Sequence, residues 1–435
     1  MIESVSHITR EDFFQKYVTR RKPCILKSIP SDLQCLRACQ DLETLREHTG
    51  DVVVAVEPIS DKGTFGTSAT KRALTMASFL KSLQNGEKLY LTTQYSELED
   101  NAILNEPLKS LTSKISIPIL PELAMDLVPA KINLWLGTSS DGTSSGLHHD
   151  FHDNFYILLA GKKRFHIFPP SWKNCKELNL NGRPHEIFQN GLISYGKGLC
   201  SNGLTRSMQA QIRVEISEQH LALARKTGQD VVEAEQQYED AMDDLLEAKM
   251  DDEDEEEDGD FEDTPENSLA EDDADDDGAT DNEQEASMLG MNTEEEERLS
   301  TLPEFSIRTK NAQASNTIRV DCSRSSTLET DEEPPSFSSL STEDVRNKLE
   351  NPDLDGIEFD LEPGQMLYLP ASYFHEVIST RAKHDYHMAV NYWFYPPDGV
   401  DTSYLEPVIM DELRKRALET YPTTKHLQTD KKVKI

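Results

Sequence analysis

Short apolar runs rich in β-branched and aromatic side chains lie toward both ends of the chain and are missing from its middle. They occur at residues 51–56, 88–92, 131–136, 147–169 and 357–395. Runs of this length and composition, bounded by polar turns, predict β-strands. Residues 1–50 are polar and read as helical, apart from a short apolar piece at 23–26. We therefore predict an all-β core with helices on its N-terminal side.

The strand pattern stops near residue 203 and a helical pattern replaces it. Apolar residues then recur at heptad spacing, with a break at Thr227. These residues are Ala224, Val231, Ala234, Tyr238, Ala241, Leu245 and Ala248. Alanine-rich seams are weak, so the pattern fits either a solvated helix or a coiled coil.

The segment from Asp251 to Glu297 is strongly acidic. It contains 25 Asp and Glu residues and no Lys or Arg, in a chain whose formal net charge is −36. The rest of the chain therefore carries a net charge of only −11. Repelling charges with little apolar surface to bury cannot offset the entropy of ordering. We predict that residues 251–332, which include a Ser/Thr-rich stretch after the acidic tract, are disordered.

These patterns divide the chain into five parts, in which one β-core is interrupted by an insertion of 130 residues. The two parts of the core must pair without the insertion, because its composition places it on the surface. The parts are 1–202 (N-terminal helices and first part of the core), 203–250 (helical), 251–332 (disordered), 333–399 (second part of the core) and 400–435 (C-terminal helix and tail).

Composition argues against several classes of protein. No basic stripe stands out, so direct binding to duplex nucleic acid is not expected. The cysteines form no CxxC pair, which excludes zinc-ribbon and redox motifs and suits a reducing compartment. No apolar signal segment or membrane-length run is present, so we expect a soluble protein of the cytoplasm or nucleus. The acidic tract favours a basic protein partner, and a homodimer remains an option.

One segment carries chemistry. In GLHHDFHDNFYILLAGKKRFHIFPP, His148 and Asp150 are two residues apart and so share one face of a strand. A second histidine, His375, lies in PGQMLYLPASYFHEVIS. Two histidines and one carboxylate are the ligand set of non-haem iron(II) oxygenases, and this set leaves three coordination positions open.

A lysine accompanies these three residues. Lys163 lies 15 residues after His148 and shares its strand parity with Phe165 and Ile167, which are apolar and expected to face inward. A buried lysine requires an anion. The position therefore suits the far carboxylate of a bound dicarboxylate.

These segments resemble the JmjC oxygenases, specifically the hydroxylase branch that includes factor-inhibiting HIF and the JmjC lysyl hydroxylases. The matching pieces are NLWLGTSSDGTSSGLHHDFHDNFYILLAGKKRFHIFPP, LEPGQMLYLPASYFHEV and AVNYWF. The resemblance implies a double-stranded β-helix of the jelly-roll or cupin type. It also implies Fe(II) as cofactor, with 2-oxoglutarate and O₂ as co-substrates.

The resemblance carries roles over to individual residues. It implies that His148, Asp150 and His375 bind iron and that Lys163 binds the distal carboxylate of 2-oxoglutarate. Other residues are matched to the co-substrate pocket: Ser145, Tyr90, Asn154, Asn391 and Trp393. Tyr90 is equally consistent with an ordinary aromatic residue of a strand. The one departure is Gln365, where the family commonly has aspartate, and this position belongs to a turn.

The neighbouring histidines read as structural residues. Strand parity places His149 and Asp153 away from the ligand face, whereas His152 shares that face and fits either the substrate entrance or a polar contact. We expect the side chains of His166, His384 and His387 to be either hydrogen-bonded within the fold or exposed to solvent.

The resemblance implies a dioxygenase that oxidises 2-oxoglutarate to succinate and CO₂. Hydroxylation of a protein side chain is the reading we favour, because of the HxD ligand pair, the early lysine and the lack of a zinc-cluster reader domain. Three alternatives remain: a JmjC lysine demethylase, an RNA-modifying oxygenase, and a catalytically silent scaffold that binds basic partners through the acidic insertion.

Overall fold

The structure is a computed structural model of the 435-residue chain. It describes residues 1–60, 63–65, 71–94, 102–138, 142–258, 334–380, 386–399 and 403–421. The predictions for residues 259–333, including most of the acidic tract and the Ser/Thr-rich stretch, lie outside these ranges. Within them, two β-sheets face each other around an apolar interior, as a double-stranded β-helix requires.

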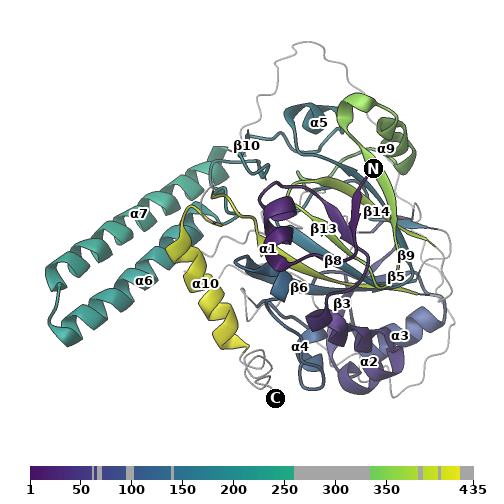
Figure 1. Ribbon diagram of the computed structural model, residues 1–435, viewed down its shortest axis with the longest axis horizontal. Coiled ribbons are helices and arrows are strands. Elements are labelled where there is room, and N and C mark those ends of the chain that lie inside the picture. Colours follow the sequence, from purple (N-terminus) through teal and green to yellow (C-terminus); the bar gives the residue numbers. More distant parts are fainter. Residues whose placement is uncertain are drawn as a thin grey trace, which may run out of the picture. The chain divides into compact units, whose positions relative to one another are not determined.

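The larger sheet has nine strands in the described parts of the chain and runs across both halves of the sequence (Figure 1). Its central strands alternate between an inward and an outward face, so each strand contributes to two cores. In spatial order the strands are β1 (Glu3–Val5), β2 (Cys24–Leu26), β13 (Met366–Leu369), β8 (Asp153–Ala160), β15 (His387–Tyr395), β6 (Val128–Gly137), β5 (Leu89–Leu91), β3 (Val53–Pro58) and β4 (Arg72–Thr75).

The smaller sheet covers the inward face of the larger one. Its strands are β12 (Ile357–Leu361), β9 (Lys162–Phe168), β14 (Phe374–Thr380) and β7 (Thr143–Ser144), all antiparallel. Phe165 and Ile167 of this sheet pack against Tyr156, Leu158 and Leu367 of the larger sheet. A separate hairpin pairs β10 (Glu186–Ile187) with β11 (Ile193–Ser194). Strand β9 precedes the insertion in the sequence, and β12 and β14 follow it. These strands pair with each other across the insertion.

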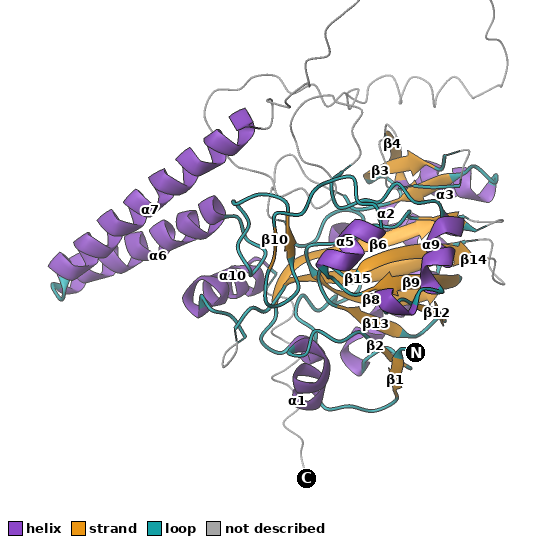
Figure 2. Cartoon of the chain, turned by 90° about the horizontal axis from the view of Figure 1, so that it is seen from above, coloured by secondary structure: helices purple, strands orange, loops and turns teal. Residues whose placement is uncertain are grey.

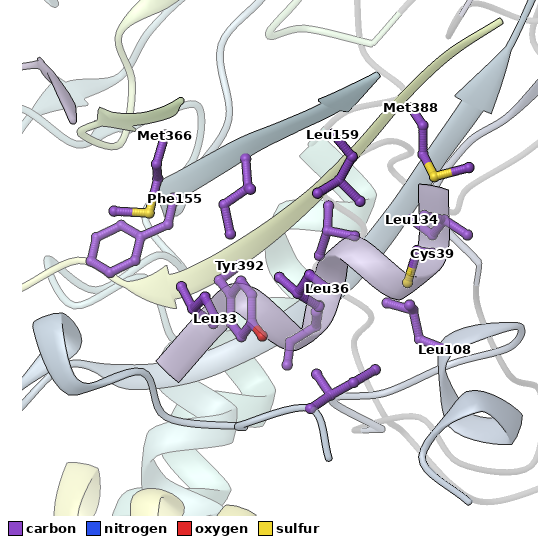
Figure 3. Close-up of a cluster of buried hydrophobic side chains, with 14 of the residues drawn as sticks. Leu33, Leu36, Cys39, Leu108, Leu134, Phe155, Leu159, Met366, Met388 and Tyr392 are labelled. Atoms are coloured by element: carbon purple, nitrogen blue, oxygen red, sulfur yellow. The ribbon is translucent and has the colours of Figure 1, made fainter. Parts of the chain in front are cut away.

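Short helices cover the outward face of the larger sheet and form a second apolar core. In Figure 3, Leu33, Leu36 and Cys39 of one such helix lie beside Leu134, Phe155 and Leu159 of the sheet. The helices of this layer are α1 (Arg10–Phe13), the π-helix η1 (Phe14–Val18), the 3₁₀ helix η2 (Ser31–Gln40), α2 (Leu42–Thr49), α3 (Met76–Gln84), α4 (Leu108–Leu111) and η3 (Glu122–Ala124). Three others, α5 (Trp172–Glu177), α9 (Thr342–Leu349) and η4 (Pro352–Leu354), pack in a separate apolar cluster with Phe168 and Phe374 of the smaller sheet.

The N-terminal region is less purely helical than its composition predicts. The apolar piece at 23–26 is strand β2, which pairs with β13 and also with β1. The edge strand β1 has only three residues and few apolar side chains, so its polar composition was misread as helical. The N-terminus thereby becomes part of the larger sheet.

The helical insertion is a hairpin of two helices. Helix α6 (Arg206–Thr227) ends at Gly228, which adopts the left-handed conformation, and α7 (Val231–Asp258) returns beside it (Figures 1 and 2). The antiparallel register is marked by ion pairs of Arg206 with Asp251 and of Arg225 with Glu235. Helix α10 (Pro407–Thr420) packs against the first part of α6.

Two sequence predictions for this region need correction. The heptad does not describe one helix: its break at Thr227 is the last residue of α6, the turn to α7 follows, and the apolar residues form the seam between the two helices. The helical part also continues to Asp258, eight residues past the predicted boundary at 250. Glutamate is a good helix former, so the glutamates in this stretch let the helix continue beyond the predicted boundary.

None of the helices in the described ranges is long and apolar enough to cross a membrane.

Candidate functional site

The three predicted iron ligands lie together at one end of the space between the sheets. One ligand atom from each of His148, Asp150 and His375 lies within 4.8 Å of the others. His375 Nε2 is 3.6 Å from Asp150 Oδ2, and the two imidazole rings are 4.3 Å apart between centroids. His375 lies on β14, whereas His148 and Asp150 lie between β7 and β8. This arrangement can hold a divalent metal ion on one face.

The local backbone differs from the expected strand. The backbone of His148 forms isolated bridges to His375 and Phe337 and belongs to no regular strand. The side chains of His148 and Asp150 do lie close together, as their spacing predicts. Their positions are determined by this pair of bridges and by the turn that follows, and not by the pleat of a continuous strand.

Both histidines have their tautomer set by a backbone carbonyl. His148 Nδ1 donates to Gly146 O at 3.0 Å, and His375 Nδ1 donates to Tyr373 O at 2.9 Å. Each Nε2 therefore keeps a free lone pair, which is the arrangement that metal-binding imidazoles require. Burial lowers the pKa of each of these histidines to about 4, and the nearby His375 also lowers that of His148. Both rings are thus neutral at physiological pH and ready to bind a metal.

The carboxylate ligand lies beside an indole. Burial raises the pKa of Asp150, while His148 and the side chain of Trp393 lower it. The Trp393 N–H is buried, and it makes no hydrogen bond of ordinary geometry with the described parts of the chain. The indole of Trp393 therefore lies beside one of the three proposed iron ligands.

Lys163 marks the other end of the space between the sheets. Its side chain is completely buried, with Nζ 2.6 Å from Ser379 Oγ, 3.0 Å from His387 Nδ1 and 3.3 Å from Tyr90 OH. None of the carboxylates in the described ranges forms an ion pair with it. Burial lowers the pKa of Lys163 to about 7. A buried ammonium surrounded by neutral groups is a site for an anion.

The two ends suit the two ends of 2-oxoglutarate. His375 and Ser379 lie on the same face of β14, four residues apart, so the metal end and the lysine end are separated by about 13 Å of strand. The hydroxyls of Tyr90 and Ser379 accept from Lys163 and can each donate to a carboxylate at the same time. The residues present therefore fit both the iron and the co-substrate.

A ladder of amides connects neighbouring strands of the larger sheet. Asn391 Nδ2 donates to Asn154 Oδ1 at 3.1 Å, and Asn391 Oδ1 accepts from Asn133 Nδ2 at 3.0 Å and from Trp135 Nε1 at 2.8 Å. All three asparagines are buried. The two predicted asparagines thus contact each other, and their amide orientations are determined by residues of β6.

Four residues near these groups were missed by the sequence reasoning. The alternation of NLWLG in β6 is a signal that could have identified Asn133 and Trp135 as inward-facing. No local signal marks Ser379, which reaches Lys163 because the two are register partners in β14 and β9. His387, which was read as an ordinary satisfied or exposed histidine, is buried and contacts Lys163 directly.

The structure does not bring Ser145 to the lysine. Its hydroxyl accepts from Val377 N at 3.0 Å and donates to Gly146 O at 2.8 Å. Ser145 therefore supports the turn that carries His148, and the hydroxyl found beside Lys163 belongs to Ser379.

The other acidic and imidazole groups of this stretch have structural partners. His149 Nε2 lies 2.7 Å from Tyr195 OH, and buried Asp153 forms an ion pair with Arg21. His152 stacks on Trp393 with ring centroids 5.6 Å apart. His166 lies between Glu358 and Glu376, at 2.9 Å from each. His384 lies outside the described residues.

Comparison with known proteins agrees with this geometry. A family model described as a cupin-like domain matches residues 10–399. JmjC domain-containing protein 4 of Schizosaccharomyces pombe is 33% identical over 440 aligned positions, which cover 92% of this chain and 85% of that protein.

Two more distant relatives match a smaller region. The human bifunctional peptidase and (3S)-lysyl hydroxylase JMJD7 is 28% identical over 37% of this chain, and the Arabidopsis thaliana lysine-specific demethylase JMJ32 is 25% identical over the same share. The matched region spans 51% and 48% of these two proteins, respectively. The family model and the yeast relative both extend over most of the chain, which is therefore a member of the cupin-like family of JmjC-domain proteins.

Proposed function

We propose that this protein is an Fe(II)- and 2-oxoglutarate-dependent dioxygenase that hydroxylates a protein side chain. One observation carries the proposal: two neutral imidazoles with free Nε2 lone pairs and a carboxylate converge within 4.8 Å. Proteins of the JmjC family are generally oxygenases of this type. The buried lysine at the opposite end of the same space supports 2-oxoglutarate as the co-substrate.

Each residue has a separate task in this proposal. His148, Asp150 and His375 would hold the iron, which supplies the oxidising chemistry when it is bound. Lys163, with the hydroxyls of Tyr90 and Ser379, would bind the distal carboxylate of 2-oxoglutarate.

Side chains with fixed orientations would line the site. Asn391 is locked by three hydrogen bonds to neighbouring side chains, so its amide presents one fixed face to the pocket. Such preorganised dipoles cost no reorganisation when a ligand binds. Trp393 supplies a hydrogen-bond donor at the metal end.

A protein side chain is the substrate class that we favour. The ligand pair is HxD and Lys163 follows it early in the sequence, which fits the hydroxylase branch better than the histone demethylases. Of the two distant relatives named above, one is named as a lysyl hydroxylase and the other as a demethylase.

The decisive experiment compares active protein with a His148→Ala variant. Purified protein, Fe(II), 2-oxoglutarate and cell extract are incubated, and succinate and modified peptides are measured by mass spectrometry. We expect succinate from wild type only, together with peptides that gain one oxygen atom. Peptides that lose methyl groups would identify a demethylase. No succinate from wild type, despite bound iron, would favour a silent scaffold.

A further inference from the structure

The residues that follow the insertion contact the proposed iron ligands. We name residues 334–342 the return segment, and within it Phe337 forms an antiparallel bridge with His148. His149 N donates to Ser336 O at 3.1 Å, and Ser338 N donates to Leu147 O at 2.8 Å. The return segment is thus hydrogen-bonded on both sides of a proposed iron ligand.

The other edge of the return segment is paired as well. Asn181 N donates to Phe337 O at 2.8 Å, and Gly182 N donates to Pro335 O at 3.0 Å. Ser338 Oγ donates to Leu178 O at 2.5 Å. Backbone held along both edges has little freedom to shift, so the side chains of this segment occupy fixed positions.

Phe337 contacts His148 through its ring. The two rings are stacked, with centroids 4.8 Å apart and an interplanar angle of 12°, and Phe337 is only 7% exposed. A second restraint on the imidazole ring of His148 is the hydrogen bond from its Nδ1 to Gly146 O. The carbonyl determines the tautomer, but a single hydrogen bond still allows the ring to tilt. The stacked phenyl ring removes this freedom.

Thr342 acts on the second histidine through Glu376. Its hydroxyl donates to Glu376 Oε1 at 2.5 Å, and the same oxygen accepts from Ser144 Oγ at 2.5 Å. Glu376 follows His375 on β14 and points to the opposite face of that strand. Its carboxylate therefore ties α9, β7 and β9 to the strand that presents His375.

We propose that Phe337 and Thr342 are positioning residues for the iron site, and that the return segment holds both histidine ligands in place. This inference rests on the proposed function. Neither side chain is a proposed metal ligand, so both act through another residue. Outer contacts of metal ligands typically change metal affinity by about 10- to 100-fold when removed.

The test measures metal binding and needs no substrate. Full-length apoprotein is titrated with Co(II), and both affinity and the visible absorption bands are recorded for wild type, Phe337→Ala, Phe337→Tyr, Thr342→Val and Thr342→Ser. Phe359→Ala is the matched control, because Phe359 stacks on Phe165 at 5.4 Å and contacts none of the proposed ligands. Thermal unfolding of every variant accompanies the titrations.

We expect Phe337→Ala to weaken Co(II) binding by about 10- to 100-fold and to shift the absorption bands, and Thr342→Val to weaken binding by about tenfold. The conservative variants Phe337→Tyr and Thr342→Ser, which keep the aromatic ring and the hydroxyl group, should bind Co(II) as tightly as wild type. Phe359→Ala should lose stability without losing affinity. If Phe337→Ala does not fold, Thr342→Val and Thr342→Ser decide the question.

Unchanged affinity and spectrum in Phe337→Ala and Thr342→Val would overturn the inference and leave the return segment a packing element. Wild-type protein that does not bind Co(II) would instead refute the proposed function, so the two failures are distinguishable.

Discussion

The two ends of the space between the sheets are built in different ways. At the metal end, the two histidines are oriented by backbone carbonyls close to them in sequence. At the lysine end, Lys163 is surrounded by side chains from β5, β14 and β15. Backbone hydrogen bonds determine the tautomer of each histidine even without a metal, and the stacked ring of Phe337 limits the tilt of His148. At the lysine end, the amino group of Lys163 is instead buried away from water, and its charge depends on the group that binds to it.

Asp150→Ala should have the largest effect. It removes the only anionic ligand of the three, so iron-dependent formation of succinate should fall below detection. Asp360→Ala is the matched control, because Asp360 pairs with Arg164 and Lys162 on the outward face of the smaller sheet. Full turnover by a folded Asp150→Ala protein would refute the assignment of the metal end.

Lys163→Ala should act on the co-substrate and not on the metal. Losing a charge-assisted contact to a buried anion costs about 2–5 kcal/mol, which corresponds to roughly 30- to 5,000-fold in the Kd of 2-oxoglutarate. The Kd for Co(II) should stay unchanged. The control is Lys162→Ala, the neighbouring lysine that pairs with Asp360 and Glu362 near the surface. Unchanged 2-oxoglutarate affinity in Lys163→Ala would place the distal carboxylate elsewhere.

His387→Ala should weaken 2-oxoglutarate binding less than Lys163→Ala does. His387 accepts from Lys163 and holds the ammonium in place, and a hydrogen bond to a charged group is worth about 1.5–3 kcal/mol, or roughly 10- to 150-fold. Isothermal titration with 2-oxoglutarate and Co(II) measures this loss. His220→Ala on α6 is the control, since His220 contacts Gln237 of the hairpin. An effect no larger than that of the control would remove His387 from the site.

The affinity for 2-oxoglutarate should fall as pH rises above 7. Burial lowers the pKa of Lys163 from 10.5 to about 7, so above that pH the folded apoprotein must take up a proton to present an ammonium. The Kd should then rise by at most about tenfold per pH unit. Proton uptake, measured in buffers of different ionisation enthalpy, should be absent in Lys163→Met.

The same pKa predicts the sign of a stability effect. Between pH 7 and 10.5 the unfolded chain binds a proton that the folded chain does not, so the stability of the apoprotein should rise with pH across this window. Lys163→Met should lack this contribution. A variant with the same slope as wild type would show that Lys163 stays charged when buried.

Replacing residues 259–330 with a flexible Gly/Ser linker should have the smallest effect. Loop-closure entropy changes slowly with length, so folding, Co(II) binding and uncoupled turnover should persist. A second variant that also removes residues 331–342 should lose metal affinity, because it deletes Phe337 and Thr342. Equal metal affinity in the two variants would contradict the proposed role of the return segment.

The metal end was largely predictable from the sequence. Two of its proposed ligands, His148 and Asp150, are two residues apart in the sequence, and the third lies on a strand with a clear apolar pattern. The prediction did not identify the bridges of His148 to Phe337 and His375, because pairing partners 189 and 227 residues away leave no local trace. At the lysine end, strand parity predicted that Lys163 faces inward, and the family resemblance added Tyr90, whose hydroxyl lies 3.3 Å from Lys163 Nζ.

By itself, the sequence determined the two-part β-core, the residues able to bind metal and the inward position of Lys163. These follow from local patterns, since strand alternation and ligand chemistry depend on residues close together in the chain. Only the tertiary structure decided that Ser379 and His387, and not Ser145, surround the lysine. It also decided that the end of the helical hairpin extends to Asp258 and that the return segment packs on His148. The register of strands distant in sequence selects these neighbours, and register is set by the packing of the whole core.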